Sequence, residues 1–139
     1  MMYHPTQISE FVKNSLSWKK TVVMAHRGGS WGPDNSMQNF ETSVKHGIEG
    51  VETDVWLSKD GHPMVLHAKA DGELSDYGFP NDYVYEWTMV ELQEKCKLAN
   101  GEPIPRFEDF LDVYAQVETL VNIELKGPLS QDRKHLYDF

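Results

Sequence analysis

Two segments of the chain alternate apolar and acidic side chains, and this alternation restricts the possible folds more than any other feature. In residues 51–57, Glu52 and Asp54 occupy one face of an expected strand and mainly apolar residues occupy the other. Residues two apart in a strand share a face and lie about 6.5–7 Å apart. Residues 120–125 repeat the arrangement with Glu124, and Lys126 follows on the same face. Because segments of helical periodicity separate these strands, the pattern predicts an α/β fold with a parallel sheet or barrel.

Shorter signals complete the expected order of elements. Capping residues open two helices: Ser36 or Asn35 opens the first, and a capping box of Thr88 and Glu91 opens the second. Strands are expected at residues 21–25, 51–57, 64–67 and 120–125, and helices at residues 7–17, 36–47, 88–98 and 107–117, with a further helix beginning at Ser130. Residues 68–87 are predicted to be a long loop. The chain therefore supplies about four strands.

Length and composition indicate one domain. The chain has 139 residues, 40% of them hydrophobic, which is enough for one core and too short for two ordinary domains. Its formal net charge of -9 disfavours nucleic acid and anionic membranes as partners. It lacks a signal-peptide core and any apolar run long enough to cross a membrane, and its single cysteine, Cys96, is expected to be a packing residue. We expect a soluble, cytoplasmic protein, with residues 1–20 as a helix and lead-in and residues 21–139 as the domain.

The acidic side chains of the two alternating strands are candidate metal ligands. Glu52 and Asp54 on one buried strand face are costly unless a cation lies between them. Glu124 adds a third carboxylate near the end of a parallel strand, where α/β barrels carry their active sites. Three oxygen donors suit Mg²⁺ or Ca²⁺. A solvated strand face explains most single pairs of this kind, so the prediction depends on two strands carrying acids at the same depth.

Two histidines and an arginine accompany these acids. His26 and His67 each end an expected strand, and a phosphodiester needs one group to accept a proton and another to donate one, which histidine does near neutral pH. Arg27 offers a planar fork for a phosphate oxygen. A packed or surface position remains the alternative for each histidine, and a surface ion pair for Arg27.

Six motifs occur in the order found in glycerophosphodiester phosphodiesterases, and the chain resembles that family from residue 26 to residue 126. They are His26-Arg27-Gly28, Pro33-Asp34-Asn35-Ser36, Glu52-Thr53-Asp54-Val55, Val65-Leu66-His67, Ile104-Pro105 and Ile123-Glu124-Leu125-Lys126. The resemblance implies a TIM-barrel fold and hydrolysis of glycerophosphodiesters to glycerol 3-phosphate and an alcohol. It also implies residue roles: metal ligands Glu52, Asp54 and Glu124, general acid and base His26 and His67, and phosphate contacts Arg27 and Lys126.

The chain departs from the family pattern in four places. Asp34 and Ser36 replace the usual Glu and Thr, which preserves the chemistry. Ala68 replaces an Asp after the second histidine and removes a partner that would orient His67. Arg106 replaces a helix-capping Thr. Length is the largest departure, since a TIM barrel needs about 250 residues and eight strands and this chain supplies roughly the first half.

These departures leave two other functions open. A non-catalytic structural or interaction protein that retains part of the fold is one, because the second half of the barrel is missing. A lysophospholipase D-type enzyme is the other, because aromatic residues of the 68–87 segment could contact acyl chains. A further hypothesis is that a second copy of this chain, or a partner chain, completes the barrel.

Overall fold

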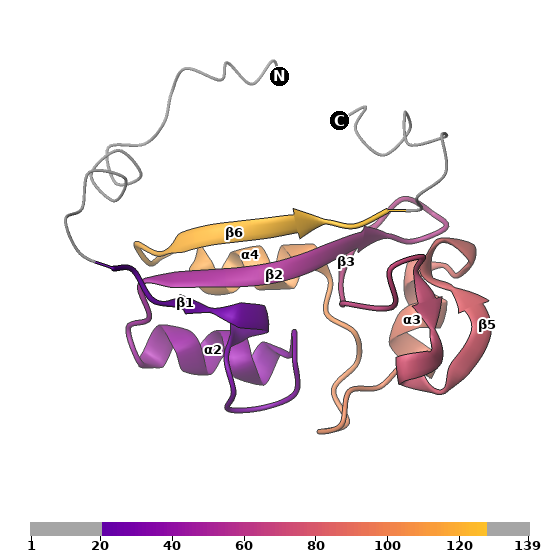
Figure 1. The fold of residues 1–139 in the computed structure, drawn as a ribbon, viewed down its shortest axis with the longest axis horizontal. Helices are drawn as coiled ribbons and strands as arrows, with labels where there is room; N and C mark the ends of the chain where they lie inside the picture. The colour runs from indigo at the N-terminus through magenta and orange to yellow at the C-terminus, as the bar shows by residue number, and fades with distance from the viewer. Residues whose placement is uncertain (1–20, 128–139) are drawn as a thin grey trace, which may run out of the picture.

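The computed structural model describes residues 21–127, and these form an α/β unit around a small sheet. The helices expected at residues 7–17 and from Ser130 lie outside the described residues, as does the proposed lead-in of residues 1–20. Figure 1 shows the sheet with its helices and a smaller lobe at one end of the strands.

The sheet has three parallel strands and one antiparallel strand. Its members are β1 (Met24–Ala25), β2 (Gly50–Leu57), β3 (Pro63–Val65) and β6 (Leu120–Leu125). β2 pairs in parallel with β1 along one edge and with β6 along the other, while β3 folds back against the end of β2 as a hairpin. The predicted α/β class with a parallel sheet is confirmed. Of the four expected strands, only three have the direction of barrel strands, and residues 21–127 do not close a barrel.

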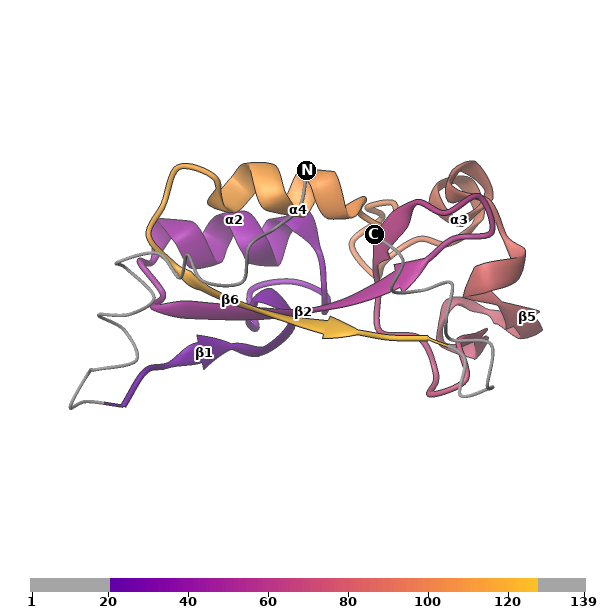
Figure 2. The same cartoon turned by 90° about the horizontal axis from the view of Figure 1, so that it is seen from above.

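Two helices cover one face of this sheet, as the view from above shows (Figure 2). They are α2 (Met37–Lys45) and α4 (Phe107–Tyr114). Ser36 caps α2 by accepting a hydrogen bond from Asn39 N, as its sequence predicts. Phe40 of α2 meets Phe110 of α4 edge to face, with ring centroids 4.8 Å apart. Together with Val51 of β2, these rings form a core between the helices and the sheet.

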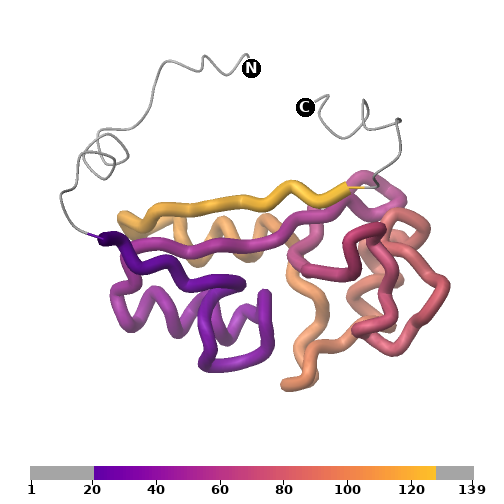
Figure 3. The backbone as a smooth tube through the Cα atoms, in the orientation of Figure 1, coloured from indigo at the N-terminus to yellow at the C-terminus, as the bar shows by residue number. Residues whose placement is uncertain are grey.

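A lobe built from residues 66–104 packs against the end of β2. It contains β4 (Glu73–Leu74), η2 (Ser75–Tyr77), β5 (Phe79–Tyr83), η3 (Val84–Glu86) and α3 (Met89–Lys95), and its path is clear in the tube drawing (Figure 3). Trp56 anchors its core. The prediction of a long loop at residues 68–87 is therefore wrong, because this segment forms a two-stranded sheet and two 3₁₀ turns.

Helix α3 begins at the predicted capping box but ends earlier than expected. Both hydrogen bonds between Thr88 and Glu91 are present. The helix stops at Lys95 instead of continuing through residue 98, because Lys97 forms an antiparallel bridge with Pro103 and needs an extended backbone. Cys96 at the end of α3 is fully buried in the lobe, and burial raises the pKa of its thiol to about 11. Its expected packing role is confirmed.

The outer strand β6 is poorly covered. Val121, Ile123 and Leu125 are 39%, 38% and 54% exposed, although they share the face that carries the core in β2. Its second edge pairs with no other strand of residues 21–127. None of the helices in the described part of the chain has the length and apolar character needed to cross a membrane.

Candidate active site

The three acidic residues singled out in the sequence lie together along the parallel strands. β2 and β6 pair so that Asp54 lies beside Glu124 and Glu52 beside Asn122. One carboxylate oxygen from each of Glu52, Asp54 and Glu124 lies within 4.8 Å of the other two. Glu52 and Asp54 are buried, and Glu124 is exposed. The expectation that two strands carry acids at the same depth is confirmed.

Two cationic side chains face this acidic cluster. Lys126 Nζ lies 2.7 Å from Glu124 Oε1 and 3.3 Å from Asp54 Oδ1. Arg27 Nε lies 3.4 Å from Asp54 Oδ2. Burial alone would lower the pKa of Lys126, but the hydrogen bond to Glu124 and the charge of Asp54 outweigh burial and raise that pKa. Both side chains are cationic at neutral pH, and they offset only part of the charge on three carboxylates.

The turn that carries Arg27 also orients Glu52. Arg27 lies in the left-handed backbone region with φ of 50°, which is uncommon for a residue other than glycine. In this conformation its backbone N–H donates a 2.9 Å hydrogen bond to Glu52 Oε2. Its NH1 donates to Asp34 Oδ2 at 2.8 Å, whereas its Nε is buried and makes no hydrogen bond within the described chain. Arg27 thus combines the expected ion pair with one unused donor beside Asp54.

The two histidines lie on loops that follow β1 and β3. His26 begins the 3₁₀ turn η1 (His26–Gly28), and its Nε2 lies 3.8 Å from Glu52 Oε2. Its side chain is 70% exposed, so a ligand has access to the ring. His67 lines a cavity of about 220 Å³ to which Arg27 also contributes. The fold therefore brings both candidate histidines near residues of the charged cluster.

The cavity beside His67 is small and has charges of both signs. Its polar and aromatic lining consists of Arg27, Asp34, His67, Asp76, Tyr77 and Lys97. Burial raises the pKa of the Tyr77 phenol above its usual range. Trp56 Nε1 donates to His67 O at 2.9 Å. Ala68 is buried with φ of 51° and offers the His67 ring no polar partner, so the contact with Trp56 holds the backbone of His67 and not its ring.

Sequence reasoning missed the residue that organises the loop bearing His26 and Arg27. Asn39 lies fully buried in α2, and its Oδ1 accepts hydrogen bonds from Trp31 N at 2.9 Å and Gly32 N at 2.6 Å. Its Nδ2 lies within 2.9–3.4 Å of four carbonyl oxygens of the same loop. An asparagine inside a helix, on the face that also buries Phe40, is unfavourable unless it is bonded in this way. An asparagine on the apolar face of a predicted helix was therefore the sequence signal that could have identified Asn39.

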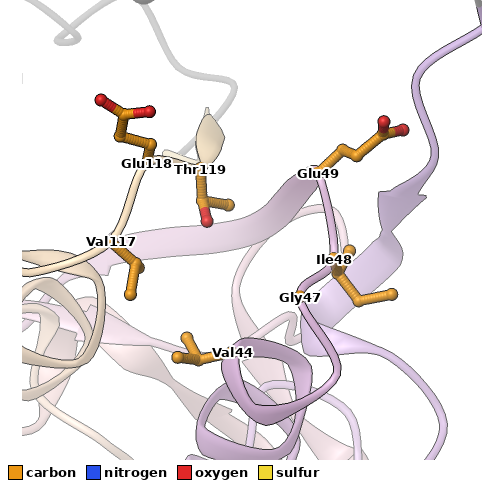
Figure 4. A pocket seen from close by; sticks show the side chains of 7 residues that line it. All are labelled: Val44, Gly47, Ile48, Glu49, Val117, Glu118 and Thr119. Carbon is orange, nitrogen blue, oxygen red and sulfur yellow. The ribbon is translucent and has the colours of Figure 1, made fainter.

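A second cavity lies at the opposite end of the strands. It measures about 190 Å³ and lies between the segments that lead into β2 and β6 (Figure 4). Figure 4 shows Val44 and Val117 pointing toward its centre, with Glu49 and Glu118 at its sides. None of the candidate site residues lines this cavity. Since active sites of α/β folds lie at the carboxyl ends of parallel strands, the charged cluster is the better candidate.

A parallel α/β sheet that gathers acids, cations and histidines in this way is typical of metal-dependent hydrolases of phosphate esters. The model of the glycerophosphoryl diester phosphodiesterase family matches residues 26–138. The chain belongs to this family.

Individual relatives agree with the family assignment. A glycerophosphodiester phosphodiesterase of Caldanaerobacter subterraneus is 36% identical over 113 residues, which cover 78% of this chain and 46% of that protein. A solved glycerophosphodiester phosphodiesterase of Thermotoga maritima is 30% identical with a TM-score of 0.59, covering 78% of this chain and 46% of that one. An Oleispira antarctica phosphodiesterase, solved with its product sn-glycerol-3-phosphate, is 28% identical with a TM-score of 0.62 and covers 77% and 45%.

The chain spans about half the length of the relatives it matches. The solved relatives are TIM-barrel proteins, so residues 21–127 correspond to an early part of that barrel. The early part contains every candidate residue named above.

Proposed function

We propose that this chain carries the metal-binding, phosphate-binding and acid–base groups for hydrolysis of glycerophosphodiesters to glycerol 3-phosphate and an alcohol. The observation that carries the proposal is the pairing of β2 with β6, which brings carboxylates of Glu52, Asp54 and Glu124 within 4.8 Å of one another. Family membership names the reaction, and the cluster has the groups that this reaction needs.

The acidic cluster fits a divalent cation chemically. Three carboxylates this close repel one another, and Asp54 is 1% exposed, so solvent screens it poorly. Arg27 and Lys126 leave part of that charge unbalanced. Oxygen donors of this kind suit Mg²⁺ or Ca²⁺, and such a cation, when bound, would polarise the phosphoryl oxygens and stabilise charge in the transition state. We propose Glu52, Asp54 and Glu124 as its ligands.

Arg27 and Lys126 are proposed to bind the phosphate. Arg27 Nε is a buried donor without a hydrogen-bond partner in residues 21–127, which is costly unless a ligand completes it. Lys126 is held at the same cluster by Glu124 and Asp54. A phosphate oxygen beside the acids would therefore meet two cations.

His26 and His67 are proposed as the acid–base pair. One histidine accepts the proton of the attacking hydroxyl, from water or from the substrate, as the new O–P bond forms. The other donates a proton to the alcohol oxygen as its bond to phosphorus breaks. Exposure of His26 and the position of His67 in a cavity give substrate access to both rings.

Most of the aromatic residues that suggested the lysophospholipase D alternative contact one another. Phe79 and Trp87 contact each other edge to face at 4.8 Å and pack on the lobe core, and Tyr83 stacks on Tyr85. Phe79 and Trp87 thus belong to the packing of the lobe, while Tyr85 stays 37% exposed. The cavity of about 220 Å³ beside His67 suits a small polar group better than an acyl chain. We therefore propose a diester whose glycerol carries no acyl chain.

The open edge of β6 keeps the non-catalytic role as a second candidate. Two copies of the described unit would supply six parallel strands, fewer than the eight of a TIM barrel, so simple pairing of two copies does not complete one. Addition of strands beside the open edge of β6 is the form of this proposal that the structure favours.

The test is release of glycerol 3-phosphate from glycerophosphocholine by the purified chain, with Mg²⁺, Ca²⁺ or EDTA. We expect turnover that EDTA abolishes and that His26→Gln reduces by roughly 10²–10⁴-fold. His62→Gln is the matched control, because His62 is an exposed histidine in the turn before β3 and lies 3.9 Å from Asp60, outside the cluster. Lysophosphatidylcholine as a second substrate tests the exclusion of an acyl chain, because it has the same choline head group and differs only in the acyl chain on its glycerol.

Turnover that persists in EDTA, or equal losses from the two histidine variants, would contradict the proposed chemistry. A folded chain that binds the cation without turnover would favour the second candidate, and light scattering would then show whether it associates with itself.

A further inference from the structure

We propose that Asn35 is a positioning residue that holds the carboxylate of Asp54 in the orientation needed to bind the cation. This inference rests on the proposed metal site but assigns a task to a residue outside it. Asn35 is 1% exposed, in the loop just before α2. Its Nδ2 donates a 3.0 Å hydrogen bond to Asp54 Oδ2.

A second hydrogen bond determines which way the Asn35 amide faces. Thr53 Oγ1 donates to Asn35 Oδ1 at 2.9 Å, and Thr53 is fully buried. A carboxylate only accepts hydrogen bonds, so the amide must direct its NH₂ group at Asp54. The hydroxyl of Thr53 then satisfies the amide oxygen. Two hydrogen bonds thus join Thr53, Asn35 and Asp54 in a row, and they prevent the oxygen and nitrogen of the Asn35 amide from exchanging places.

This chain of hydrogen bonds divides the two oxygens of Asp54 between two tasks. Oδ2 accepts from Asn35 and lies 3.4 Å from Arg27 Nε, whereas Oδ1 lies 3.3 Å from Lys126 Nζ. Without Asn35, the carboxylate can rotate toward either cation. Partners that fix a ligand in this way tune metal affinity even though they do not touch the metal.

The backbone at Asn35 explains why this position suits asparagine. Its φ is 58°, in the left-handed region that asparagine and glycine tolerate better than other residues. Ser36 then caps α2, so the start of the helix fixes the place from which the amide reaches β2. Glycine at position 35 would keep the backbone and remove only the amide.

The experiment compares Asn35→Gly with Asn81→Gly in the full chain. Asn81 also has a positive φ, of 68°, but is exposed and lies in the lobe, so it reports the backbone effect alone. Binding of Mg²⁺ and Ca²⁺ is measured by isothermal titration calorimetry, beside the thermal midpoint of each variant without metal. We expect Asn35→Gly to weaken cation binding by roughly 10–100-fold and Asn81→Gly to leave it unchanged.

A milder pair of variants tests the same chain of hydrogen bonds if Asn35→Gly does not fold. Thr53→Val removes the hydroxyl that orients the amide, whereas Thr53→Ser keeps it. We expect the valine variant to bind the cation more weakly than wild type and the serine variant to restore most of the affinity. Because removal of Asn35 leaves the hydroxyl nothing to orient, the two losses should not add in the double variant.

Unchanged cation affinity in a folded Asn35→Gly variant would overturn the inference, and so would a wild-type chain that binds no cation. Weaker cation binding in Asn35→Gly, together with no diester hydrolysis by wild type, would support the positioning role while refuting the proposed enzyme activity.

Discussion

Asn39→Ala should be among the most destabilising substitutions in the part of the chain that carries His26 and Arg27. Removal of the amide leaves Trp31 N and Gly32 N without their acceptor and the carbonyls of Gly29 and Gly32 without their donor. These contacts are only partly buried, so water can reach the groups, and each loss costs about 1 kcal/mol. Alanine returns about 0.7 kcal/mol through its better helix propensity. The net loss in the free energy of unfolding is therefore about 3 kcal/mol.

Urea denaturation followed by circular dichroism measures this loss, and a drop of roughly 10–15 °C in the melting temperature should accompany it. Glu41→Ala is the matched control, because Glu41 lies two residues further along α2 and is exposed, so its free energy should change by at most about 0.5 kcal/mol. A loss below about 1 kcal/mol for Asn39→Ala would show that water replaces the amide, and would refute the reasoning that Asn39 holds the loop.

Three further predictions concern strain, pH and metal. Gly28→Ala should lower the free energy of unfolding, measured by urea denaturation, by about 3 kcal/mol, because φ is +86° and a Cβ would lie 2.8 Å from the Phe40 ring. Gly47 also has a positive φ but has open space around it, so Gly47→Ala should lower the same free energy by only about 1 kcal/mol. The hydrogen bond from Arg106 lowers the pKa of Asp109, so this carboxylate stabilises the folded chain above about pH 4 and loses that effect as pH falls through its folded-state pKa. Wild type should therefore be more stable than Asp109→Asn at neutral pH, and the difference should vanish at about pH 2. Denaturation at the two pH values measures this. Saturation with Mg²⁺ at about 100 times its Kd should stabilise the fold by about 2.7 kcal/mol, visible as a rise in melting temperature that EDTA reverses; no rise would count against the metal site.

The alternating strands were the most predictable part of the molecule. One face of β2 must pack against helices, so apolar and acidic positions could be separated by counting residues, and the pairing of Asp54 with Glu124 follows from equal depth in neighbouring strands. Capping by Ser36 and by the Thr88–Glu91 box was predictable for a similar reason, since caps depend on residues within one turn.

The lobe was not predictable, because its elements are too short to show a period. β4 has two residues and pairs with β5 across an irregular register, and only contact with Trp56 and the buried face of α3 makes the segment compact. The end of α3 has the same origin, since the bridge between Lys97 and Pro103 overrides helical periodicity. The antiparallel direction of β3 could have been predicted from the sequence, because a connection of five residues is too short for a parallel crossover.

The candidate site was predictable in its residue types and less so in its supports. Glu52, Asp54, Glu124 and Lys126 follow from strand faces, whereas Arg27 lies in the turn after β1, and the structure brings all five together. The amide of Asn39 acts on backbone groups of the loop before α2, and backbone groups carry no sequence signal of their own.

All groups of the charged cluster come from residues 26–126, and this has a consequence for synthesis of the protein on the ribosome. Every candidate group, from His26 to Lys126, has been made once the ribosome passes residue 126, and domains fold as units from the amino-terminal side while the chain is still growing. A ligand that binds only the folded form stabilises it by mass action. A divalent ion bound between β2 and β6 would therefore stabilise the nascent chain by joining β6, the last of these strands to be made, to β2 as soon as both are present.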